Sequence, residues 1–62
     1  MSLKEQILEV RNSGRVNMLD ASGVQYVANE CGFYDLVCFV EERRRDYARY
    51  IMTGDESILA AF

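Results

Sequence analysis

Residues 32–54, GFYDLVCFVEERRRDYARYIMTG, decide the fold that this sequence predicts. Between its two terminal glycines the stretch has neither proline nor glycine, and it is long enough for about six helical turns, or roughly 30 Å. When successive residues are placed about 100° apart, four apolar side chains fall on one stripe: Leu36, Val40, Tyr47 and Ile51. The spacing predicts one long helix over residues 33–53, with this stripe facing a core.

Arg43 falls inside the stripe, at a position where an apolar residue is expected. In one interpretation its aliphatic stem packs along the stripe while the guanidinium reaches solvent or a carboxylate such as Asp20. In the other, guanidinium groups bind a phosphate-bearing ligand and aromatic rings stack on its base, and symmetric association duplicates the groups in a composite site. The candidate ligand-binding residues are Arg43, Arg44, Tyr47 and Tyr50.

A first, shorter helix is predicted over residues 3–13. Ser2 and Glu5 have the S-x-x-E spacing of a capping box, in which each side chain binds a backbone N–H group of the other residue. Apolar residues then recur at i, i+4 and i+7, and Gly14 is placed to end the helix as a left-handed C-terminal cap.

A second helix is predicted over residues 21–31, with Asp20 as its N-cap and Gly32 at its end. Gly23 in its first turn lowers helix stability by about 1 kcal/mol relative to alanine, and the sequence offers no reason for this glycine. No stretch alternates with the period of a strand. We therefore predict an all-α fold, a small three-helix domain over residues 1–54 with a long third helix.

Residues 55–62 are predicted to form an apolar C-terminal tail or a short helix. The long helix has a second apolar strip on its reverse side, and two short helices cover only one side of it. A chain of 62 residues buries only about 60% of the surface that its unfolded form exposes, so we expect a homo-oligomer. The expected oligomer interface consists of Tyr34, Cys38, Met52, Ile58, Leu59 and Phe62.

The composition argues against catalysis. The chain has no histidine, so a nucleophile paired with histidine is impossible, and it has no glycine-rich phosphate loop. Cys31 and Cys38 form no C-x-x-C pair and are expected to be reduced, small, buried apolar residues. We expect no enzymatic activity, no cofactor and no metal. Because the chain has neither a secretory segment nor a long apolar run, the expected location is the cytoplasm.

The net charge of −3 does not favour general binding to nucleic acid or to anionic membranes. Four of the seven basic residues nevertheless lie within positions 43–49. Glu41 with Arg45, and Asp46 with Arg49, have the spacing of helical ion pairs, which favours a solvated, salt-bridged surface. The alternative is that this segment binds DNA.

Most of the chain resembles a known family. The resemblance covers residues 4–54, through the segments KEQILEVRNSG, NMLD and VQYVANECGFYDLVCFVEERRRDYARYIMTG. The run GFYDLVCFVEE, with the later Tyr47 and the Thr53-Gly54 end, is its most specific part. The family consists of very short, uncharacterised proteins of bacteriophages and prophages of low-GC Gram-positive bacteria. It has no assigned activity, so the resemblance implies a context, a phage accessory protein in bacterial cytoplasm, and no site.

Three functional hypotheses follow from the residues and the resemblance. In the first, the chain is a non-enzymatic binding protein that inhibits a host process, such as antiviral defence, by blocking a host protein or sequestering a nucleotide signal. In the second, it is a small DNA-binding transcriptional or packaging accessory protein that uses the segment from Arg43 to Arg49. In the third, it is purely a structural assembly protein. The expected partners are other copies of itself and a host protein or a phosphate-bearing nucleotide.

Overall fold

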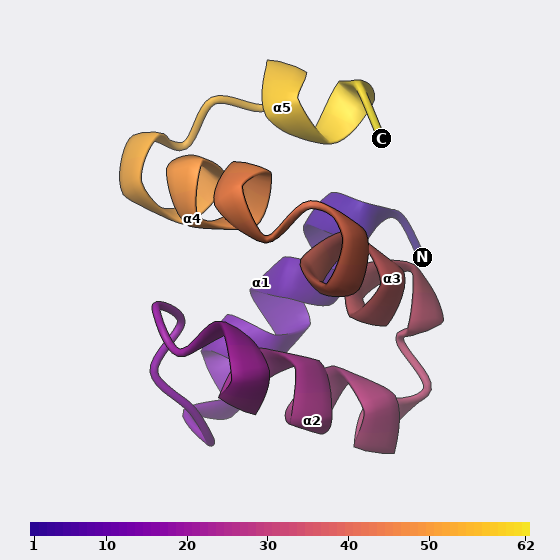
Figure 1. Cartoon of the computed structure of the whole chain (residues 1–62). Helices are drawn as coiled ribbons and strands as arrows, with labels where there is room; N and C mark the ends of the chain where they lie inside the picture. Colours follow the sequence, from indigo (N-terminus) through magenta and orange to yellow (C-terminus); the bar gives the residue numbers. More distant parts are fainter.

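The computed structural model describes residues 1–62 and is all-helical, as predicted. Five helices follow one another along the chain (Figure 1): α1 (Leu3–Ser13), α2 (Ala21–Cys31), α3 (Tyr34–Glu42), α4 (Arg44–Thr53) and α5 (Ser57–Ala60). In Figure 1, α2 lies at the bottom and α4 and α5 at the top, with α1 and α3 between them. No helix combines the length and the apolar character that a bilayer crossing requires.

The first two helices begin and end at the residues expected from their caps. At α1, the hydroxyl of Ser2 accepts a hydrogen bond from the N–H of Glu5 at 3.2 Å, and the Glu5 carboxylate accepts one from the N–H of Ser2 at 2.8 Å. At α2, the carboxylate of Asp20 accepts from the N–H of Gly23 at 3.1 Å. Each helix ends at a glycine with positive φ, so local sequence signals account for this half of the chain.

Gly23, which the sequence left without a reason, is explained by packing. A Cβ atom at this position would lie 2.6 Å from Oδ2 of Asp20 and 2.7 Å from Cγ2 of Val16. Both separations are too short for atoms that are not bonded to each other. The reason is that the capping residue and the preceding connector fold over the first turn of α2. Glycine leaves the space that this close approach needs.

The prediction of one long helix over residues 33–53 is wrong, because α3 and α4 are separate helices that meet at Arg43. Arg43 has φ −134° and ψ 49°. Its N–H still donates to the carbonyl of Phe39 at 2.8 Å, and its own carbonyl accepts from the N–H of Tyr47 at 2.9 Å. In a straight helix Arg43 would lie within the apolar stripe, between Val40 and Tyr47. The break instead leaves the Arg43 side chain 47% exposed.

The helices enclose one apolar core. Its ten buried apolar residues come from α1 to α4: Ile7, Val10, Val24, Val27, Ala28, Leu36, Phe39, Val40, Tyr47 and Tyr50. The rings of Phe39 and Tyr47 meet edge to face across the break, with centroids 6.3 Å apart. The break therefore lets α3 and α4 direct their apolar residues into a single core.

The C-terminal tail contains α5 and packs on its own chain. Ile58 and Leu59 are partly buried against the core. The ring of Phe62 meets the ring of Phe39 edge to face, with centroids 5.2 Å apart, and Phe62 remains 45% exposed. These three residues, predicted at an oligomer interface, thus make contacts within the chain. The radius of gyration is 10.1 Å, close to the roughly 10.5 Å expected of a compact domain of this length.

Candidate functional site

The two arginines of the predicted ligand pocket lie at the surface and have partners. The Nη1 atom of Arg43 lies 3.6 Å from Oδ2 of Asp46. Nη1 of Arg44 lies 3.4 Å from the hydroxyl oxygen of Ser22, at the limit of a hydrogen bond. Asp20, considered as a partner of Arg43, instead caps α2. Of the two interpretations of Arg43, the structure therefore agrees with the one in which its guanidinium reaches a carboxylate. That carboxylate belongs to Asp46.

The two tyrosines of the predicted pocket belong to the core. Tyr47 is 1% exposed, and its hydroxyl donates to the carbonyl of Met18 at 2.7 Å. Burial raises the pKa of Tyr47 to about 12, with a smaller contribution from the Asp20 carboxylate. Tyr50 is also buried. The ring of Tyr47 has no free face on which a base could stack, so the four predicted residues do not converge on one cavity.

One of the two predicted ion pairs in the arginine segment forms. Asp46 and Arg49 pair at 3.7 Å. Glu41 and Arg45 do not pair, because the break between them removes the i, i+4 geometry of a continuous helix. The Glu41 carboxylate accepts a hydrogen bond from Nε2 of Gln25 at 2.8 Å instead. Arg45 is left as an exposed cation without a carboxylate partner.

The outward side of α3 carries apolar and acidic groups together. Tyr34 is 64% exposed, and Cys38, one turn further along, is also exposed. Three exposed carboxylates surround them, and α3 has no basic residue. We call this surface the acidic face; it consists of Tyr34, Asp35, Cys38, Glu41 and Glu42.

The outward side of α4 is its counterpart with the opposite charge. Arg45, Arg49 and Met52 recur at i, i+4 and i+7, so they share one side of the helix. All three are exposed, and Met52 is 74% exposed. Arg44 lies at the start of the same helix and is also exposed. We call the surface formed by Arg44, Arg45, Arg49 and Met52 the basic face.

The prediction that both cysteines are buried is wrong, because Cys31 and Cys38 are free and exposed. Cys31 is the last residue of α2, where the chain turns away at Gly32. Cys38 lies opposite the buried side of α3. No three histidine, cysteine, aspartate or glutamate side chains gather closely enough to hold a metal ion.

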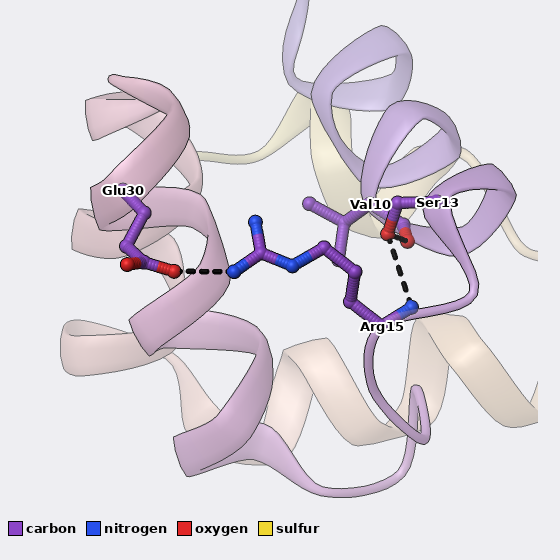
Figure 2. Close-up of polar contacts among 4 residues, drawn as sticks. All are labelled: Val10, Ser13, Arg15 and Glu30. Atoms are coloured by element: carbon purple, nitrogen blue, oxygen red, sulfur yellow. Dashed lines mark hydrogen bonds and ion pairs between the residues drawn. The ribbon is translucent and has the colours of Figure 1, made fainter.

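A polar cluster ties the connector between α1 and α2 to the end of α2 (Figure 2). The guanidinium of Arg15 binds the carboxylate of Glu30, and this contact raises the pKa of Arg15. The hydroxyl of Ser13 donates to the carbonyl of Val10 at 2.6 Å and accepts from the N–H of Arg15 at 3.3 Å. These contacts hold the connector in place. Because the guanidinium of Arg15 is paired with Glu30, it is not free to bind a ligand.

A pocket of about 150 Å³ lies between α1, the connector and α4. It is lined by Ile7, Leu8, Arg11, Met18, Tyr50, Ile51 and Gly54. Tyr50 is the only one of the predicted ligand residues among them. The sequence reasoning missed this pocket because its walls come from three separate segments. The one local signal was Leu8, which widens the apolar side of α1 one turn before Arg11.

Five helices, two outward faces of opposite charge and a small apolar pocket define a small all-α domain. A family model described as Domain of unknown function (DUF5049) matches residues 1–55, and the chain belongs to this family. The matched residues span α1 to α4 and end before α5. No curated protein and no solved structure matches the chain.

Proposed function

We propose that this protein is a small, non-enzymatic phage or prophage accessory protein that associates with itself and inhibits a host process by blocking a host protein in the bacterial cytoplasm. The observation that carries the proposal is the pair of outward faces with opposite charge. The resemblance of residues 4–54 to short phage and prophage proteins supports the context.

The two faces complement each other between copies. The acidic face presents Tyr34 and Cys38 among carboxylates, and the basic face presents Met52 among guanidinium groups. Tyrosine, methionine and arginine are enriched in protein interfaces. Charges of opposite sign on the two surfaces set the orientation of one partner relative to the other. Because every copy carries both faces, a symmetric dimer makes the contact twice. Association also adds stability to a domain whose own core is small.

The protein-blocking form of the hypothesis has more support than nucleotide sequestration. Sequestration relied on rings that stack on a base, and the ring of Tyr47 is buried with its hydroxyl already bonded to Met18. Blocking needs exposed apolar anchors, which Tyr34 and Met52 supply. Because the symmetric dimer covers both faces, a host protein and a second copy would compete for the same anchors.

DNA binding is the second candidate, because the exposed guanidinium groups of Arg44, Arg45 and Arg49 share one helix. Neutralised phosphates make such binding fall steeply with salt. A gel-shift titration at low salt tests this candidate. Retardation that is lost on Arg45→Gln supports it, and the absence of any retardation rejects it.

Sedimentation of charge-reversed variants tests self-association. The double variant Arg45→Glu/Arg49→Glu has two acidic faces, and Asp35→Lys/Glu42→Lys has two basic faces. We expect each alone to associate on the order of tenfold more weakly than the unmodified chain, because like charges then oppose each other. An equimolar mixture should recover the association. A chain that stays monomeric at every concentration, or variants that do not recover on mixing, would reject this interface.

A further inference from the structure

We infer that the pocket between α1 and α4 binds a small amphipathic carboxylic acid, with one ring or branched aliphatic group inside the pocket and the carboxylate on Arg11. The pocket shares no residue with the acidic or the basic face. This inference is therefore independent of the proposed self-association and of any host target.

The volume of the pocket sets the size of its occupant. A cavity of about 150 Å³ lined by aliphatic and aromatic side chains accommodates a molecule the size of benzene. Ile7 and Leu8 of α1, with Ile51 of α4, supply aliphatic walls. A phenyl ring or a branched aliphatic chain fills this space.

The charge of the pocket sets the second part of the ligand. Arg11 is the only charged residue that lines it, and the four ion pairs of the chain involve other cations. The guanidinium of Arg11 therefore keeps its donors for a ligand, and its planar fork matches a carboxylate. No carboxylate of the protein lines the pocket, so its walls place no like charge beside an anion.

The walls are held in place before any ligand binds. Ile7 and Tyr50 belong to the buried core. The carbonyl of Met18 accepts the hydrogen bond from Tyr47, which holds the connector against α4. The N–H of Gly54 donates to the carbonyl of Tyr50 at 2.7 Å. A preformed pocket loses little conformational freedom on binding, which favours affinity for a small ligand.

Titrations of the isotope-labelled full chain, followed by NMR, test the site with three probes: phenylacetate, its neutral analogue phenylacetamide, and acetate. We expect phenylacetate to bind saturably at millimolar concentration and to shift the signals of Leu8, Met18 and Ile51. Phenylacetamide should bind about tenfold more weakly at the same residues, because it lacks the charge that Arg11 recognises. Acetate, which has no apolar group, should give no saturable shift.

Two variants of equal charge separate the site from general electrostatic attraction. Arg11→Gln should reduce phenylacetate binding to the level of phenylacetamide and leave phenylacetamide binding unchanged. Arg43→Gln removes the same charge from a half-exposed arginine outside the pocket and outside both faces, and should leave both affinities unchanged. Leu8→Trp fills the pocket and should abolish binding of both probes; circular dichroism checks that this variant folds. If Leu8→Trp does not fold, the comparison of the two arginine variants still decides.

Three results would overturn the inference. One is the absence of saturable shifts from all three probes up to about 20 mM, which corresponds to a binding free energy weaker than about 2.3 kcal/mol. Another is an equal loss of phenylacetate binding in Arg11→Gln and Arg43→Gln. The third is binding of phenylacetamide as tight as that of phenylacetate, because Arg11 would then not recognise the carboxylate.

Discussion

The first two helices and the next two are specified by the chain in different ways. α1 and α2 each begin at a residue whose side chain caps the helix and end at a glycine with positive φ. Neither α3 nor α4 begins with a side-chain cap, and the two are separated at an arginine. Local hydrogen bonds therefore mark the bounds of the first pair, whereas burial of the apolar side chains determines where the second pair divides. This contrast can be tested with single substitutions.

The largest effect is expected for Tyr47→Ala in the second pair. The substitution removes a ring that is 1% exposed and leaves the carbonyl of Met18 without its donor. Deleting a large buried aromatic side chain destabilises by about 3–5 kcal/mol, which is comparable to the whole stability that a domain this small obtains from its core. We expect a largely unfolded protein by circular dichroism and urea titration.

Tyr34→Ala is the matched control for this substitution. Tyr34 lies on α3 with 64% of its surface exposed, so its removal should change the free energy of unfolding by less than about 0.5 kcal/mol. If the two variants lose similar amounts of unfolding free energy, the buried ring of Tyr47 contributes no more to stability than the exposed ring of Tyr34. That result would contradict the proposal that burial of apolar side chains divides α3 from α4.

An intermediate effect is expected for Gly23→Ala in the first pair. Alanine is the better helix former by about 1 kcal/mol, yet its Cβ would lie 2.6 Å from Oδ2 of Asp20. We expect the crowding to prevail and the variant to be less stable by about 1–2 kcal/mol, measured by urea unfolding. Asn29→Ala, at an exposed position of the same helix, is the control and should be neutral or slightly stabilising. A Gly23→Ala variant that is more stable than the unmodified chain would contradict this prediction. It would show that the Asp20 side chain moves aside at little cost.

The smallest effect is expected for Arg43→Ala. The side chain is half exposed, and its one ion pair, with Asp46, spans 3.6 Å, so its removal should cost less than about 0.5 kcal/mol. The break should persist, because Phe39 and Tyr47 on either side of it remain packed together. Carbonyl and Cα chemical shifts that stay non-helical at position 43 would support this view. Shifts that become helical would place the cause of the break in the arginine side chain.

The sequence was informative where the signal is local. The capping box at Ser2 and Glu5 and the N-cap at Asp20 are short-range contacts, and the structure shows each of them. The apolar stripe correctly named Leu36, Val40 and Tyr47 as core residues. It failed at the break, because a helical count carries no information on where the chain bends to bury two stripes in one core.

The candidate sites follow the same division. Tyr34 and Met52 were predicted to lie on the reverse side of the helix, at an oligomer interface, and on their separate helices both are exposed within the single chain. The sequence analysis assigned Tyr47 both to the core-facing stripe and to a ligand pocket. The structure places it in the core. Cys31 was expected to be buried by its helical position, but the helix ends there and leaves it exposed. The pocket beside Arg11 has no sequence signature, because its walls meet only when α1 and α4 pack together.

The sequence by itself determined the all-α class, the bounds of α1 and α2 and most of the core, because caps and apolar periodicity act over a few residues. The tertiary structure alone decided the division of α3 from α4, the docking of α5 and the pocket between α1 and α4. Each of these depends on how much apolar surface distant segments can bury against one another. The energy of that burial is shared over the whole chain and is not encoded at any one position.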